Sequence, residues 1–334
     1  METKIITCTG YGGSGSSAIT DLLKEFNNGI SLGDAEFWFL QAYNGVSDLE
    51  YFLVDGNHRS KVNLAVKRFL KYVDDNEGFY SNFFGKNYKK YSCEYIESLI
   101  SAKFRKSISQ YEIESSLLRK IIFRVSPLVQ RVFKRTINGE FTPYIPRVEK
   151  YYSYPGKEKF YIETKKYTSK LFNEISNTQN KAFIAIDQLV PSTNTLRYFN
   201  YIDNLKVIIV DRDPRDLYLL NETVWQGAAF VCDTSDTNSF IDWYRTMRIH
   251  RNHEIKSQNV LYMMLEDMIY NYEKTIREIY RFLDLDSLNH IHKKKYFNPE
   301  ISINNTKLWM KKENEKYLSE ISKIEKELSE YCYK

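Results

Sequence analysis

Cysteine is scarce in this sequence: there are four, at positions 8, 93, 232 and 332, and no two of them form a CxxC pair. That spacing excludes a disulfide framework and a cysteine zinc site, and it predicts reduced thiols. No stretch approaches the ~18 apolar residues of a membrane span, so no transmembrane helix is expected. The N-terminus also lacks the basic and apolar blocks of a signal peptide, which makes the cytoplasm the expected compartment.

A large charge excess of one sign is missing as well. Lys and Arg number 48 against 43 Asp and Glu, which gives a net charge of +5. This mild surplus suits an anionic ligand better than a nucleic-acid track, so we expect no nucleic-acid partner. Two histidine pairs, His250 with His253 and His290 with His292, have metal-like spacing, but no cysteine or carboxylate cluster accompanies them. We therefore expect surface histidines and no metal site.

The apolar residues, 43% of the chain, predict a globular fold. Four short apolar runs predict buried strands: Lys4–Thr9, Phe183–Ile186, Val207–Val210 and Val260–Leu265. Segments with apolar residues at i, i+3, i+4 and i+7 predict helices between and after them. This alternation predicts an α/β fold with a central parallel β-sheet flanked by helices. We expect a single domain over residues 1–334, with a mainly helical insertion at about 45–175, where the alternation is lost.

A glycine-rich segment, Gly10-Tyr11-Gly12-Gly13-Ser14-Gly15-Ser16-Ser17, follows the first predicted strand at once. Small residues let consecutive backbone N–H groups converge on an anion, and the following helix adds its dipole. The residues expected to bind the anion are Gly12, Gly13, Ser14, Gly15, Ser16 and Ser17. The NTPase pattern G-x4-G-K-[ST] is met at Gly10 and Gly15, but Ser16 stands at the lysine position. That serine argues against Mg²⁺-dependent NTPase chemistry, and a tight turn without a ligand is the structural alternative.

Three segments resemble motifs of the PAPS-dependent sulfotransferases, where PAPS is 3′-phosphoadenosine 5′-phosphosulfate. Ser14-Gly15-Ser16-Ser17 resembles the family's 5′-phosphosulfate loop. Val207–Asp216 resembles its strand ending in Arg-x-Pro-Arg-Asp, and Val260–Leu285 resembles its late strand, Glu-Asp and helix. The resemblance implies a P-loop-like sulfotransferase fold, closest in character to bacterial and glycan sulfotransferases.

The resemblance also implies nucleotide-binding residues beyond the loop. Arg212 is expected to bind the 3′-phosphate of the nucleotide, and Asn221 stands beside the place of the family's serine. Asn305, Thr306 and Lys307 lie where the family has a loop over the nucleotide's 3′ end. A surface ion-pair turn at Arg212 and a plain polar loop near residue 305 are the alternatives.

Two departures from the family concern catalysis. The family's basic residue before the loop serine is absent, because Gly13 stands there. Its replacement is sought among His58-Arg59-Ser60-Lys61, Lys67-Arg68 and Lys165-Lys166. The usual catalytic histidine is also absent, and we predict Glu36 as general base, with Asp187 as the second candidate.

The sequence as a whole predicts a sulfotransferase that moves a sulfuryl group from PAPS, releasing adenosine 3′,5′-bisphosphate (PAP). The acceptor is expected to be a hydroxyl or amine of a carbohydrate or small molecule. The alternatives are a P-loop kinase or other nucleotide-binding protein, and a catalytically altered PAP-binding scaffold. The composition leaves oligomer formation open.

Overall fold

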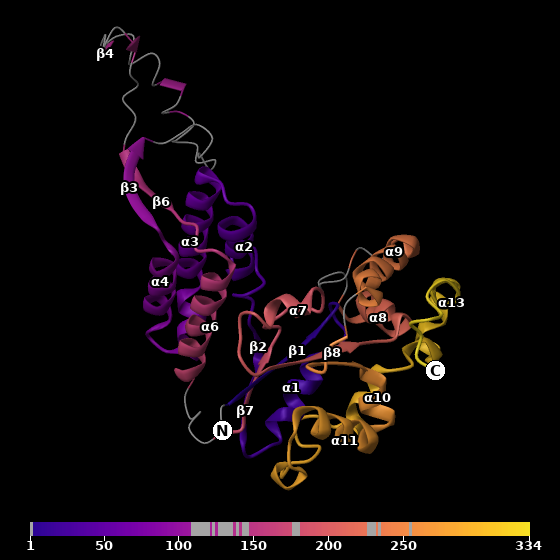
Figure 1. Cartoon of the computed structure of the whole chain (residues 1–334). Helices are drawn as coiled ribbons and strands as arrows, with labels where there is room; N and C mark the ends of the chain where they lie inside the picture. The colour runs from indigo at the N-terminus through magenta and orange to yellow at the C-terminus, as the bar shows by residue number, and fades with distance from the viewer. Residues whose placement is uncertain are drawn as a thin grey trace. The chain divides into compact units, whose positions relative to one another are not determined.

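The computed structural model describes residues 3–107, 121, 124–125, 136–137, 140–141, 147–175, 181–225, 232, 235–253 and 256–334. The chain divides into two compact units. The first unit is Met1–Gln41 with Ser176–Lys334, and the second is Ala42–Ile175. Each unit is described by itself below (Figure 1).

The first unit is built on a five-stranded sheet in the order β2-β7-β1-β8-β9, with every neighbouring pair parallel. The strand bounds are Gly29–Glu36 for β2, Phe183–Asp187 for β7, Lys4–Gly10 for β1, Leu205–Asp211 for β8 and Val260–Met264 for β9. Every residue of β7 is buried, as expected for a parallel strand covered on both faces. The predicted α/β fold with a central parallel sheet is confirmed.

Helices of the first unit follow the strands. Their bounds are Ser17–Lys24 for α1, Thr195–Tyr198 for α7, Pro214–Leu220 for α8, Thr237–Arg248 for α9, Leu265–Tyr270 for α10, Tyr272–Leu283 for α11, Pro299–Ser302 for α12 and Leu318–Glu327 for α13. A single π-helical turn, η3 (Asn221–Trp225), continues α8. The 3-10 turns are η4 (Ile249–Asn252), η5 (Ser287–Asn289), η6 (Ile303–Asn305), η7 (Leu308–Met310) and η8 (Lys312–Tyr317).

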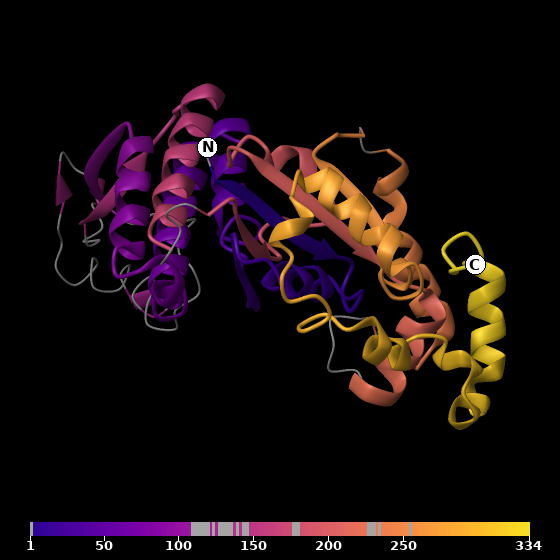
Figure 2. The ribbon, with the colours of Figure 1, turned by 90° about the horizontal axis from the view of Figure 1, so that it is seen from below.

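Among the described residues of this unit, buried apolar side chains form a larger and a smaller cluster. In the larger one, apolar residues of α1, α10 and α11 pack against β1, β7, β8 and β9. These three helices lie below the sheet in Figure 1, and the orange α11 crosses in front of the strands in Figure 2. The smaller cluster joins α8, α9 and α13 with Leu308. Packing of the helices in these two clusters holds the strands in place. The loops that form the site begin at the carboxyl ends of these strands.

The second unit contains α2 (Val46–Glu50), the π-turn η1 (Tyr51–Asp55), α3 (Arg59–Phe84), α4 (Tyr88–Leu99) and α6 (Lys157–Asn173). Its packing is aromatic: Tyr95 of α4 stacks on Tyr167 of α6 with ring centroids 4.7 Å apart. An antiparallel strand pair, β3 (Ala102–Ser107) with β6 (Arg147–Tyr152), was not anticipated from the sequence. β4 (Thr136–Ile137) and β5 (Glu140–Phe141) form a separate antiparallel pair of two residues each.

None of the described helices combines the length and the apolar character that a membrane crossing requires. Within the same described ranges, no three His, Cys, Asp or Glu side chains gather closely enough to hold a metal ion. The expectation that His290 lies on the surface is wrong. Its side chain is buried against Glu25, because the carboxylate there needs a donor.

Candidate active site

The glycine-rich loop joins the carboxyl end of β1 to the first turn of α1. Gly12, Gly13 and Gly15 have φ angles of 91°, 64° and 88°. Residues with a Cβ rarely adopt such angles, so the loop depends on glycine there. The backbone N–H of Tyr11 donates to Ser14 Oγ at 3.3 Å, and this bond closes the turn from within. The loop is therefore a tight, glycine-dependent turn at the start of α1.

The serine hydroxyls of this loop have different surroundings. Ser16 immediately precedes α1, and its Oγ accepts a hydrogen bond of 3.0 Å from Gln188 Nε2. Gln188 Oε1 in turn accepts from Thr9 Oγ1 at 3.0 Å. Ser14 is buried inside the turn, whereas Ser17 is exposed at the helix start. The contacts of Gln188 hold the start of α1 and the end of β1 against the end of β7.

The loop borders a cavity of about 720 Å³, and all residues lining this cavity belong to the first unit. All the predicted loop residues line it, as do Glu36, Asp187, Arg212 and Asn305. These residues come from the ends of four different strands and from the segment before η7. The cavity thus gathers most of the site residues predicted from the sequence. Ligands of parallel α/β sheets bind at this carboxyl edge.

Two carboxylates face this cavity from neighbouring strands. Glu36 ends β2 and Asp187 ends β7, and they are partners in the parallel register. Glu36 is exposed and its Oε2 accepts a hydrogen bond of 3.1 Å from Trp38 Nε1. Asp187 is buried, and its Oδ1 has no hydrogen-bond partner among the described residues. Burial, reinforced by the charge of Glu36, raises the pKa of Asp187 to about 7.

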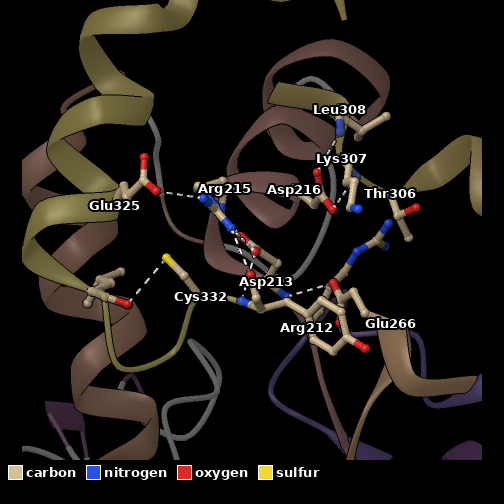
Figure 3. Close-up of polar contacts among 12 residues, drawn as sticks. Arg212, Asp213, Arg215, Asp216, Glu266, Thr306, Lys307, Leu308, Glu325 and Cys332 are labelled. Carbon is tan, nitrogen blue, oxygen red and sulfur yellow. Dashed lines mark hydrogen bonds and ion pairs between the residues drawn. The ribbon is translucent and has the colours of Figure 1, made fainter. Parts of the chain in front are cut away.

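Arg212 lies directly after β8 and is buried, with 5% of its surface exposed. One guanidinium nitrogen, Nη2, donates to the backbone oxygen of Asn305. Its Nε is buried without a hydrogen-bond partner in the part of the chain that the structure describes. In Figure 3 the guanidinium extends towards the Thr306–Lys307 segment. A buried cation with an unused donor is costly unless a ligand pairs with it, so this position suits an anion.

The arginine and aspartates after Arg212 form a different, internal network (Figure 3). Arg215 Nη2 lies 2.6 Å from Asp213 Oδ2, and Arg215 Nη1 lies 2.9 Å from Glu325 Oε1. The Arg215 guanidinium also lies 4.0 Å from the ring centre of Trp309. The turn is therefore buried rather than a surface ion pair. It ties α8 to α13 and leaves Arg212 to face the cavity.

Acidic groups surround Arg212 on its protein side. Asp216 accepts backbone hydrogen bonds from Lys307 at 2.8 Å and from Leu308 at 2.7 Å. Glu266 accepts one of 2.9 Å from the N–H of Asp213. Burial raises the pKa of Asp216 to about 6 and that of Glu266 to about 7. Asp216 thus holds the backbone of Lys307 and Leu308, Glu266 holds the backbone after Arg212, and both carboxylates lie near the Arg212 charge.

The remaining predicted binding residues lie outside the cavity wall. Asn221 is buried in the π-turn after α8. Thr306 is also buried, and its hydroxyl donates to the carbonyl of Ile303 at 2.8 Å. The ammonium of Lys307 lies 4.6 Å from the ring centre of Tyr270. The structure brings Asn305 to the cavity, and a nucleotide role for the other three stays a prediction.

Several cavity residues were not anticipated. Trp38, Trp225, Tyr296 and Phe297 supply aromatic surface. Trp225 lies so close to the loop that a Cβ on Gly13 would meet its ring at 2.7 Å. No local pattern marks these aromatic residues, because the chain contains many Tyr and Phe residues elsewhere. The basic residues considered as substitutes at position 13, from His58 to Lys166, all belong to the second unit.

Comparisons with known proteins bear on the fold. No family model matches the chain, and no curated protein matches its sequence. The chain is similar to the sulfotransferase domain of the Synechococcus PCC 7002 olefin synthase, at 13% identity and a TM-score of 0.40, covering 89% of this chain and 76% of that one. A Mycobacterium avium sulfotransferase matches at 12% identity and a TM-score of 0.39, covering 98% and 76%.

A third structure, retinol dehydratase in complex with androsterone and the inactive cofactor PAP, matches at 15% identity and a TM-score of 0.30, covering 96% and 71%. The predicted resemblance to sulfotransferases thus has counterparts among solved structures.

Proposed function

We propose that this chain is a PAPS-dependent sulfotransferase acting on a hydroxyl or amine of a carbohydrate or small molecule. The observation that carries the proposal is the cavity itself. A glycine loop at a helix start, a buried arginine with an unused donor and two carboxylates all line it. Sulfuryl transfer needs an anion cradle, a second anion site and a proton acceptor together.

The residues present fit PAPS better than ATP. The backbone N–H groups from Gly12 to Ser17 are suited to the 5′-phosphosulfate, and Arg212 is suited to the 3′-phosphate through its unused Nε. Asn305 accompanies Arg212 at that end of the cavity. The loop has Ser16 where an NTPase has its lysine. PAPS, when bound, supplies the activated sulfuryl group.

Glu36 is the proposed general base. Its carboxylate accepts the proton of the acceptor O–H or N–H, while the acceptor atom bonds to sulfur and the bond between sulfur and the 5′-phosphate oxygen breaks. PAP is the product that leaves. The loop N–H groups and the start of α1 stabilise the charge that develops on the phosphate oxygen. Trp38 orients Glu36 through its 3.1 Å hydrogen bond.

Titration calorimetry tests the proposal. PAP should bind at least ~10-fold more tightly than ATP, a difference of about 1.4 kcal/mol. Equal affinities, or ATP binding that requires Mg²⁺, would favour the alternative of a P-loop kinase. If PAP binds but PAPS transfers no sulfuryl group to any of a broad acceptor panel, the chain is an altered PAP-binding scaffold instead.

A further inference from the structure

The charges around the cavity are distributed unevenly. Among the described residues that line it, Arg212 is the one with a basic side chain, whereas Asp21, Glu36 and Asp187 are acidic. A site for a polyanionic nucleotide is expected to carry more positive than negative charge. This inversion calls for a physical explanation.

The sheet order separates the two signs. The strands run β2-β7-β1-β8-β9, so the glycine loop after β1 lies between the carboxylates of β2 and β7 on one side and Arg212 of β8 on the other. With the 3′-phosphate at Arg212 and the sulfuryl group at the loop, the acceptor is left on the β2–β7 side. The acidic half of the cavity is therefore the acceptor half.

The three carboxylates of this half have different partners. Asp21 is paired with Lys24, whose Nζ lies 3.1 Å from its Oδ1. Glu36 accepts from the neutral indole of Trp38, whose side chain is 40% exposed. Asp187 is 4% exposed, and its Oδ1 has no partner within the described ranges. Two carboxylates thus face the acceptor side without a described cation.

The charged groups that act on the Asp187 carboxylate, Glu36 and Asp21, are both acidic. Glu36 on β2 and Asp21 on α1 both repel its charge. Burial and the charge of Glu36 both raise the pKa of Asp187. Among the described lining residues the one basic side chain, Arg212, lies on the β8 side of the loop, so the β2–β7 side has no positive charge of its own. A cation brought by the ligand would relieve that repulsion and satisfy the buried oxygen.

We propose that the acceptor carries an ammonium group, which the cavity binds between Glu36 and Asp187 and against the ring of Trp38. Carboxylates supply charge-assisted hydrogen bonds to an ammonium, and an indole face adds a cation–π contact. The ammonium also supplies positive charge near the sulfuryl group, where Gly13 provides no basic side chain. Acceptors bearing a carboxylate, sulfate or phosphate at this point are repelled. This inference rests on the proposed function and names its substrate class.

Three phenols of matched size test the charge preference: tyramine (ammonium), tyrosol (neutral hydroxyl) and 4-hydroxyphenylacetate (carboxylate). Each is titrated into the PAP-loaded full chain and followed by ligand-observed NMR. Tyramine should bind at least ~10-fold more tightly than tyrosol, and 4-hydroxyphenylacetate most weakly. Equal affinities, a preference for the carboxylate, or undetectable binding of tyramine overturns the proposal.

Two variants locate the preference. Glu36→Gln should reduce the tyramine-to-tyrosol ratio at least ~5-fold, because it removes one charged partner. Glu278→Gln, the same exchange on the exposed face of α11, should leave the ratio unchanged. An unchanged ratio in Glu36→Gln also overturns the proposal. The PAP titration that precedes each experiment reports separately on the proposed function, since PAP binding without a charge preference refutes this inference alone.

Discussion

Glu25 and His290 form a hydrogen-bonded pair inside the first unit, with Oε2 and Nε2 2.5 Å apart and both side chains wholly buried. Glu25 follows α1 directly, and its carboxylate also accepts the backbone N–H groups of Lys294, Tyr296 and Phe297. One carboxylate therefore positions a segment whose Tyr296 and Phe297 line the cavity. The helix that begins at the anion loop thus also holds the aromatic wall of the site.

Glu25→Ala should destabilise the protein by about 3–5 kcal/mol, because it leaves a buried histidine and three backbone donors without their acceptor. Denaturant unfolding measures this loss. Glu278→Gln, at an exposed position of α11, should change stability by less than ~0.5 kcal/mol. A loss at Glu25 as small as this control would mean that the pair does not hold the wall.

Arg212→Ala should weaken PAP binding by about 2–3 kcal/mol, since a buried charge-assisted pair with the 3′-phosphate is lost. Adenosine 5′-phosphosulfate, which has no 3′-phosphate, should bind the variant and the unmodified chain alike. Calorimetry with both nucleotides makes the comparison. Arg277→Ala, an exposed arginine of α11, is the matched control. Equal weakening of both nucleotides would assign Arg212 a structural role.

Glu36→Gln should lower kcat by about 10²–10⁴-fold while PAP affinity stays unchanged, because the amide keeps the size of the side chain but accepts no proton. Steady-state sulfation kinetics measure it. Asp187→Asn should cost much less. If Asp187→Asn has the larger effect, the two carboxylates have exchanged roles; if neither matters, carboxylate catalysis is refuted.

Asp187 should make the protein less stable as the pH rises. Its folded pKa of about 7 is above the unfolded value of 3.8, so between these values the folded state binds more protons than the unfolded one. Its contribution is greatest below about pH 4 and disappears as the pH rises through 7. Asp187→Asn should therefore stabilise the protein at pH 8 by ~2–4 kcal/mol relative to its effect at pH 4. Thermal unfolding at both pH values tests this, and a constant difference would contradict it.

Introducing a lysine at position 13, where the sulfotransferase motif has a basic residue, should not improve PAP binding. Gly13 has φ 64°, and a Cβ there would meet the ring of Trp225. Gly13→Lys should therefore cost ~1–3 kcal/mol of stability and weaken PAP, as measured by unfolding and calorimetry. Gly78→Ala, where nothing lies within 4 Å of the new Cβ, should be neutral or stabilising by up to ~1 kcal/mol. A stable Gly13→Lys variant with tighter PAP binding would refute the claim that the positive φ and the ring of Trp225 exclude a side chain at position 13.

The sequence was sufficient for features that depend on local patterns. The apolar run at Phe183–Ile186 and the glycine loop each reflect backbone preferences, and both were predicted at their observed positions. Arg212 and Glu36 were selected because their surroundings resemble sulfotransferase motifs. The structure places both at carboxyl ends of parallel strands, Arg212 after β8 and Glu36 at the end of β2, and such ends lie at one edge of the sheet. Their shared cavity follows from that rule.

Contacts between distant segments could not be predicted in this way. His290 and Glu25 are 265 residues apart, and nothing near either residue distinguishes a buried pair from two solvated side chains. Trp225, in the π-turn after α8, lies against Gly13. The spacing of apolar residues in the sequence does not predict this contact. The strand pair β3–β6 joins Ala102–Ser107 to Arg147–Tyr152 across a long intervening segment.

The position of β1 at the centre of the sheet has a consequence for the order of folding. The hydrogen bond from Thr9 to Gln188, which braces the loop, spans 179 residues. At a synthesis rate of about 5–20 residues per second, β1 waits roughly 10–40 s on the ribosome before β7 is made. Parallel pairing over such a distance is slow, because the chain loses loop entropy before any contact forms. The loop therefore obtains its contacts with Gln188 only after most of the chain before β7 has been made.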